Sequence, residues 1–345
     1  AVLPCPGIPF PAECICYASN NPAFCDTLDM TCCWWPTEPE FGHNIYVIDR
    51  TVPMQMSNDN HEPGSKIMPD GTVIHFPNDG MAEIEAAVDW LFNHQNTAPF
   101  ISYRLIQRLV KSNPSPAYVG RVAAAFANNG NGVRGDLKAV IKAILLDEEA
   151  RSAAGYLDEY AGKLREPMLR YTHLSRSMPT VTDQGRYWNN GFEYLNDTRQ
   201  HVLASPTVFN FYTPDFQPVG DIAAAGLVAP EFKLHNTATA ITYINRTYAW
   251  TAWDYLMGSW QGSETNPDAV HLKPTSIESL SYDTEDLINE LDMLLTHGQL
   301  SDETRQMVRN ALNPLYWTWN ADSPFYRTRL AIHLIMISPD YNCTK

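Results

Sequence analysis

The seven cysteines of this 345-residue chain are placed unevenly, and this constrains the fold more than any other sequence feature. Six lie near the start and one near the end: Cys5, Cys14, Cys16, Cys25, Cys32, Cys33 and Cys343. A reduced protein more often scatters its thiols through the core. The proline-rich segment 1–43 has little apolar periodicity, so cross-links would have to stabilise it. We therefore predict a disulfide-stapled cap over residues 1–43.

A zinc site is the alternative for the same cysteines. Cys14-x-Cys16 and Cys32-Cys33 are close pairs of thiols, but zinc ribbons use two C-x-x-C pairs and the sequence has none. A bond between adjacent Cys32 and Cys33 would close a strained ring, so each is expected to pair elsewhere. Because the number of cysteines is odd, at least one is free or pairs outside the chain. Cys343 is a candidate for a disulfide that links the C-terminus to the cap.

Disulfides persist in oxidising compartments, so the cap predicts a secreted or cell-surface protein. The first residues lack the basic and apolar regions of a signal peptide, and we expect the chain to be already processed. No stretch approaches the roughly 20 apolar residues of a membrane span, which argues against membrane insertion. Sequons that permit N-glycosylation begin at Asn196, Asn245 and Asn342.

Composition restricts the class of partner. The chain has 24 Lys and Arg against 39 Asp and Glu, a formal net charge of −15. Nucleic-acid binding needs clustered cations, so this balance excludes DNA or RNA as the main partner. With 44% hydrophobic and 18% charged residues, the chain is globular and not disordered.

The residues after the cap, 44–345, predict a mainly α, orthogonal multi-helix domain with a small β-hairpin. The β-prone runs 44–48 and 71–76 place the hairpin within 44–77, on either side of a polar loop. From residue 80, apolar side chains recur at three- and four-residue spacing. Helices are expected from about 80, 100, 116 and 136, and then over 164–178, 237–257, 284–297, 302–312 and 324–337.

Several helix ends carry their own signals. Ser115 before Pro116, Asp136 and Ser301 are predicted N-caps. Gly130-x-Gly132-x-x-Gly135 fits a dinucleotide-binding pattern, but a helix precedes it, so we interpret the glycines as a helix–helix turn. In the helix that Asp136 starts, Leu137, Val140, Ile141, Ile144 and Leu145 are predicted to face inward.

One polar loop, residues 58–66, gathers the best candidate site residues. His61, Glu62 and Lys66 combine an imidazole, a carboxylate and an ammonium in one short segment, which suits acid–base work or metal binding. His75 and His94 would join His61 as metal ligands if the hairpin folds onto the first helix. The alternative is a solvated loop held by Asx turns. No H-E-x-x-H or G-x-S-x-G motif is present.

Several segments resemble one family in the same order and with the same spacing. They are APFISYRLIQRLVKSNPSPAYVGRVAAAF (98–126), GVRGDLKAVIKAILLDEEAR (132–151), GKLREPMLR (162–170), LASPTVFNFYTPDF (203–216), AAAGLVAPEF (223–232), LLTHGQLSDETR (294–305) and RLAIHLIMISPDY (329–341). The chain thus resembles the domain-of-unknown-function 1800 family over about residues 44–345, with the cap outside.

The resemblance implies a mostly helical, exported protein and no settled activity. The family's His-Asp-x-Gly-x-Lys-like loop matches His61 to Lys66, with Glu62 in place of aspartate, and a family His-Pro-Asn-Thr-Ala-Pro-Phe run matches the segment from His94. Family members usually carry a further helical N-terminal half that this sequence lacks. If that half is a separate partner chain, apolar surface within residues 80–150 should be uncovered.

Two functions follow as hypotheses. The first is a structural or interaction protein in a larger extracellular assembly, with its own cleaved N-terminal half or copies of itself as partners. The alternative is a secreted metal-dependent enzyme, a hydrolase or oxidoreductase acting on a polymer through His61, Glu62, Lys66, His75 and His94. The sequence predicts no cofactor, apart from a divalent metal under the second hypothesis.

Overall fold

The computed structural model describes residues 3–4, 13–14, 58, 61–75, 79–152, 161–181, 192–252, 271–315 and 323–344. The chain is mainly α-helical with short strands, as the sequence predicts. It divides into two compact units, residues 1–94 and 95–345. In the cap, β1 (Leu3–Pro4) pairs antiparallel with β2 (Glu13–Cys14). Six of the seven cysteine side chains in the predicted disulfides, all but that of Cys343, lie outside the described residues, and so the disulfides stay a prediction.

The hairpin of the first unit lies later than its predicted start. β3 (Lys66–Ile67) pairs with β4 (Val73–Ile74), whereas the predicted strand at 44–48 lies outside the described residues. Residues 66–67, predicted as loop, become a strand because Pro69-Asp70-Gly71 makes a tight turn: Gly71 has φ +85°, and Met68 N–H donates to the Thr72 carbonyl at 2.8 Å. α1 (Gly80–Asn93) follows, and Asp79 caps it as N-cap.

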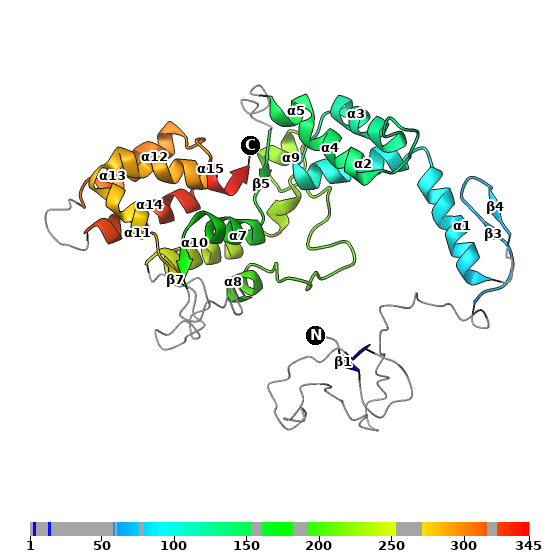
Figure 1. Cartoon of the computed structure of the whole chain (residues 1–345), viewed down its shortest axis with the longest axis horizontal. Helices are drawn as coiled ribbons and strands as arrows, with labels where there is room; N and C mark the ends of the chain where they lie inside the picture. The colour runs from blue at the N-terminus through cyan, green and yellow to red at the C-terminus, as the bar shows by residue number, and fades with distance from the viewer. Residues whose placement is uncertain are drawn as a thin grey trace. The chain divides into compact units, whose positions relative to one another are not determined.

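The second unit begins with a small helical bundle (Figure 1). Its helices are α2 (Thr97–Leu109), α3 (Pro116–Ala127), α4 (Leu137–Leu146) and the short α5 (Glu148–Arg151). Their buried core is Ala98, Ile106, Tyr118, Val122, Phe126, Val140 and Ile144. Burying each of the Val, Ile and Phe side chains in this core stabilises the fold by about 1.5–3 kcal/mol.

The prediction of which α4 residues face inward is partly wrong. Val140 and Ile144 are buried, but Leu137, Ile141 and Leu145 are exposed. These three lie at four-residue spacing, one turn apart along the same side of the helix. α4 contacts α2 and α3. This packing buries only part of the apolar surface of α4. The predicted uncovered apolar surface within residues 80–150 is therefore present on α4.

The predicted caps are confirmed. Ser115 Oγ accepts a hydrogen bond from the Tyr118 N–H at 3.1 Å. The Asp136 carboxylate accepts hydrogen bonds from the backbone N–H groups of Lys138 and Ala139. Gly130, Gly132 and Gly135 all have positive φ and connect α3 to α4. They therefore form a helix–helix turn, as interpreted from the sequence. They do not form the loop between a strand and a helix that a dinucleotide site would need.

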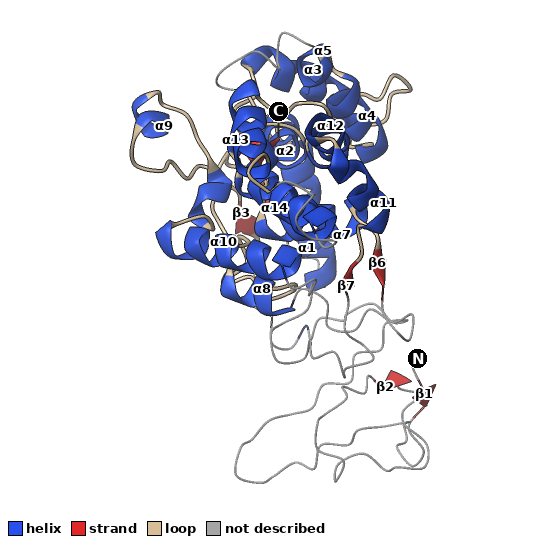
Figure 2. Ribbon diagram, turned by 90° about the vertical axis from the view of Figure 1, so that its left-hand side faces the viewer, coloured by secondary structure: helices blue, strands red, loops and turns tan. Residues whose placement is uncertain are grey.

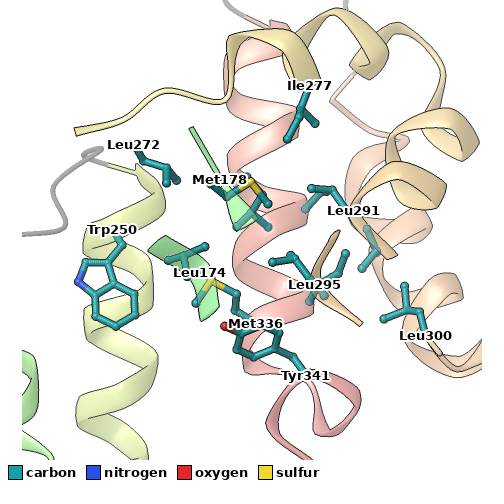
Figure 3. Close-up of a cluster of buried hydrophobic side chains, with 14 of the residues drawn as sticks. Leu174, Met178, Trp250, Leu272, Ile277, Leu291, Leu295, Leu300, Met336 and Tyr341 are labelled. Atoms are coloured by element: carbon teal, nitrogen blue, oxygen red, sulfur yellow. The ribbon is translucent and has the colours of Figure 1, made fainter. Parts of the chain in front are cut away.

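The larger bundle of the second unit surrounds one helix, α14 (Ser323–Ile337). α14 contacts α10 (Thr237–Ala252), α11 (Thr275–Glu278), η4 (Ser279–Tyr282), α12 (Thr284–Leu295), α13 (Asp302–Leu312) and α15 (Pro339–Asn342). α7 (Pro167–Ser177) contacts α12, and α8 (Phe192–Asp197) contacts α10. Figure 3 shows Leu174, Trp250, Leu291 and Met336 converging from four of these helices. Trp250 is thus a core residue, as predicted.

Short pairings connect segments that are far apart in the sequence. β5 (Lys163–Leu164) pairs with β8 (Cys343–Thr344), which holds the described C-terminal residues against the start of α7. β6 (Thr180–Val181) pairs with β7 (His271–Leu272), visible in Figure 2. Segment 200–235 is mostly loop, as predicted, with α9 (Asp221–Ala224) and η3 (Pro230–Lys233). None of the helices in the described residues has both the length and the apolar character needed to cross a bilayer.

Candidate functional site

The predicted loop His61–Lys66 is organised around a buried carboxylate on α1. His61 Nε2 lies 2.5 Å from Oε2 of Glu83, whose side chain is 6% exposed. Lys66 Nζ lies 3.6 Å from the other carboxylate oxygen, too far for a hydrogen bond but close enough for an ion pair. The hydrogen bond from His61, followed by the charge of Lys66, lowers the pKa of Glu83. Sequence reasoning missed Glu83, although it lies in the first turn of a capped helix.

The contacts of Lys66 within the loop explain why glycine and lysine follow His61 at these positions. Lys66 Nζ donates to the carbonyl oxygens of Glu62 and Gly64 at 3.0 Å each. Gly64 has φ +97°, a left-handed conformation that favours glycine. The Glu62 side chain is 85% exposed, so its extra methylene relative to aspartate does not disturb the contacts with Glu83. His61 and Lys66 thus balance a buried charge.

The other two candidate histidines are placed apart from this cluster. His75 is exposed after β4, and His94 ends α1 with its ring 5.5 Å from the ring of Trp90. In the part of the chain that the structure describes, no three His, Cys, Asp or Glu side chains form a group that could hold a metal ion. His61, His75 and His94 are therefore not brought together as one set of ligands.

Four family-like segments meet in a polar network in the second unit, in which Glu166, Gln200 and Tyr212 are buried and Arg108 is partly exposed. Arg108 on α2 donates to Glu166 Oε1 at 2.6 Å and to the Tyr212 hydroxyl. The Gln200 amide donates to the other oxygen of Glu166. Burial opposes the charge of Arg108, but Tyr212 and Glu166 outweigh it and raise its pKa. Burial, and then Glu166, raises the pKa of Tyr212.

A buried ion pair continues this network. Lys163 Nζ lies 3.2 Å from Glu231 Oε1, and the two side chains are 6% and 3% exposed. The ammonium also donates to the carbonyls of Gln107 and Arg108 at 3.3 and 2.8 Å. Its three donors therefore have three acceptors. The donors and acceptors of the network bond to one another, as in a structural anchor.

The anchor holds a surface loop, residues 198–216, which we call the apolar loop. Gln200 and Tyr212 tie its two ends to Glu166 and Arg108, and Gln107 donates to the Pro214 carbonyl at 3.2 Å. Between the ties, Leu203, Val208 and Phe209 are 101%, 95% and 74% exposed. The structure thus fixes the base of the loop and leaves apolar side chains at its surface.

The backbone of the apolar loop also has an unusual conformation. Arg199, Leu203 and Asn210 have φ of 61°, 60° and 74°, in the left-handed region. For Arg199 and Leu203 this costs about 1–2 kcal/mol each, whereas asparagine adopts it more readily, and such a conformation persists where surrounding contacts over-determine the backbone. The ties to Glu166, Arg108 and Gln107 supply such contacts. The sequence showed this segment only as proline- and aromatic-rich, which does not reveal the anchor.

The remaining candidate residues fall in different environments. Asn196 on α8 and Asn245 on α10 are exposed. Asn342 is 8% exposed, and its amide nitrogen donates to the carbonyls of Met336 and Ser338 at 2.9 and 2.8 Å. A glycan at Asn342 would not fit the folded protein, because a sequon needs a surface side chain. Cys343 is half-buried in β8.

Comparison with known proteins gives one family. No curated protein and no solved structure matches the sequence significantly. The family model described as "Protein of unknown function (DUF1800)" matches residues 42–343. That range contains the His61–Lys66 loop, the polar network and the apolar loop, and it leaves most of the predicted cap outside. The match covers most of the chain, and the protein therefore belongs to the DUF1800 family.

Proposed function

We propose that the protein is a secreted, disulfide-stapled interaction protein that acts as a component of a larger extracellular assembly. The observation that carries the proposal is the apolar loop, whose exposed side chains stand on an anchored base. Monomeric proteins rarely keep large contiguous apolar patches in water, and those that exist mark binding surfaces. No charged residue occurs from Val202 to Pro214, so a partner would meet an uncharged surface there.

Anchoring favours binding through this loop. A loop that must be ordered on binding loses part of the interaction energy as conformational entropy. The ties at Gln200, Tyr212 and Pro214 hold the ends of the apolar loop before any partner arrives. Fully burying a Leu, Val or Phe side chain contributes about 1.5–3 kcal/mol. Leu203, Val208 and Phe209 together would then supply most of the affinity of a modest interface.

The partner that we propose is a second copy of this chain. Most soluble oligomers are assembled from identical chains. The exposed stripe Leu137, Ile141 and Leu145 on α4 offers an apolar surface on which the apolar loop of another copy can dock. The net charge of −15 opposes self-association, and this repulsion is weakened by salt.

We predict that self-association of the purified chain strengthens with salt and depends on Phe209. Phe209→Ser should weaken it by at least about tenfold, because a buried phenyl ring contributes more than 1.4 kcal/mol. Met293→Ser on α12 removes an apolar side chain that is 63% exposed and serves as the matched control. Sedimentation velocity at about 0.05 and 0.5 M NaCl measures both effects. A monomer at both salt concentrations, or equal association of the two variants, would overturn the proposal.

The predicted cap has its own test. Intact protein treated with iodoacetamide without reductant should gain at most one adduct, whereas reduction first should expose all seven cysteines. Chelator alone should not change the first result. Several reactive thiols at the outset would remove the argument for export. Thiols that become reactive only after chelation would identify the zinc alternative.

The alternative function, a secreted metal-dependent enzyme, has less support. It needs several ligands around one ion. His61 instead contacts Glu83, and the described residues bring no third ligating side chain to this pair. The interaction protein therefore stays the leading proposal.

A further inference from the structure

A second feature of unit 2, separate from the apolar loop, is a cavity beside the buried ion pair. Its volume is about 320 Å³, and it lies between the α2–α3 connection, residues 161–164, the segment 221–232 and Cys343. Its wall is mainly apolar and includes Leu164, Ile222, Ala225, Leu227, Val228 and Phe232.

Two polar side chains at the cavity wall, Lys163 and Asn113, are already paired. The ammonium of Lys163 bonds to Glu231 and to two backbone carbonyls. The Asn113 side chain donates to the Val228 carbonyl and accepts from the Val228 N–H, both at 2.9 Å. These groups offer a ligand no free charge and no free donor. A charged guest would lose its hydration without compensation.

One side of the cavity is formed by a short helical element. α9 carries Ile222, and Ala225 follows it directly; Figure 2 shows α9 on a loop that stands out from the helices. Gly220 and Gly226 flank the element with φ of 125° and 70°, left-handed conformations that favour glycine. The Gly226 and Leu227 N–H groups donate to Ala223 and Ile222 carbonyls within the same element. These bonds hold residues 222–227 together as one turn beside the cavity.

We infer that this cavity binds a small, neutral, mainly apolar molecule, with the α9 segment as one of its walls. An apolar cavity of about 150 Å³ accepts benzene, so about twice that volume suits a two-ring aromatic or a chain of roughly eight carbons. Ligand sites typically begin at about 300 Å³. Asp221 lines the cavity and adds a negative charge, which disfavours a carboxylate ligand.

The test uses two probes of similar shape and different charge, 2-naphthol and 2-naphthoate. Fluorescence anisotropy with the full chain should show 2-naphthol binding at least about tenfold more tightly, because the carboxylate must lose its water. Ala225→Trp fills the cavity and should weaken 2-naphthol binding by at least about tenfold. Both Ala225 and its neighbour Ala224 are exposed, and Ala224 does not line the cavity. Ala224→Trp is therefore the matched control.

Binding to the apolar loop is distinguished by a third variant. Phe209→Ser should leave 2-naphthol binding unchanged if the probe occupies the cavity. Absence of 2-naphthol binding would overturn the inference. The same conclusion follows if the two tryptophan variants bind equally, if 2-naphthoate binds as tightly as 2-naphthol, or if Phe209→Ser abolishes binding.

Discussion

Lys163→Met is expected to lower the free energy of unfolding by about 3–5 kcal/mol, the usual effect of removing one partner from a buried ion pair. The substitution leaves Glu231, 3% exposed, with a charge that water cannot solvate. It also removes the donor to the Gln107 and Arg108 carbonyls. Because native domains are stable by only about 5–15 kcal/mol, the loss should be evident in urea-induced unfolding followed by tryptophan fluorescence.

Two further variants locate the cause of this loss. Arg309→Met breaks the Arg309–Glu285 pair, whose side chains are 31% and 48% exposed, and should have a clearly smaller effect. Lys163→Met combined with Glu231→Leu removes both charges and should be more stable than Lys163→Met alone. If Lys163→Met unfolds at the same urea concentration as Arg309→Met, the pair is not buried in solution.

Acid is expected to destabilise the second unit through two histidines that accept hydrogen bonds from arginines. His173 Nδ1 lies 3.0 Å from Arg165 Nη1, and His235 Nδ1 lies 3.2 Å from Arg170 Nη1. Burial, and then Arg165, His297 and Arg176, lowers the pKa of His173 to about 4. Burial and Arg170 lower the pKa of His235 to about 4. Protonating either ring would place two cations side by side.

The direction of the pH effect follows from these values. Each pKa is lower in the folded chain than the ordinary 6.5, so between pH 6.5 and 4 the unfolded chain binds more protons. The stability contribution is complete above pH 6.5 and falls as the pH drops toward 4. Both histidines are half-buried, and solvent screening reduces the expected loss to about 1 kcal/mol per histidine between pH 6.5 and 5.

His173→Gln combined with His235→Gln isolates this effect. Glutamine keeps an acceptor for the arginine but does not titrate. In the range from pH 5 to 6.5, where most carboxylates stay ionised, the double variant should show a flatter dependence of unfolding free energy on pH than the wild type. Urea unfolding at several pH values measures the slope. Equal slopes in the two proteins would show that these rings do not cause the acid loss.

Features that depend on neighbouring residues were predictable from the sequence. Ser115, Asp136 and Ser301 cap their helices, and the atoms that they bond lie within three residues along the chain. The mainly α class and most helix positions follow from apolar spacing, which is also local. The width of a buried face is not local. Ile141 fits the apolar pattern of α4, yet it is exposed, because contact with α2 and α3 decides which side is covered.

The candidate sites divide in the same way. Sequence composition alone identified His61 and Lys66 as a polar group in one loop, but not Glu83, which lies 22 residues beyond His61. Tyr212 is 104 residues from Arg108, and no periodicity connects them. By itself the sequence determined the family, the helices and their caps, since these follow from spacing and short-range hydrogen bonds. Only the tertiary structure decided which charges are buried together and which apolar residues stay exposed, because both depend on which surfaces packing removes from water.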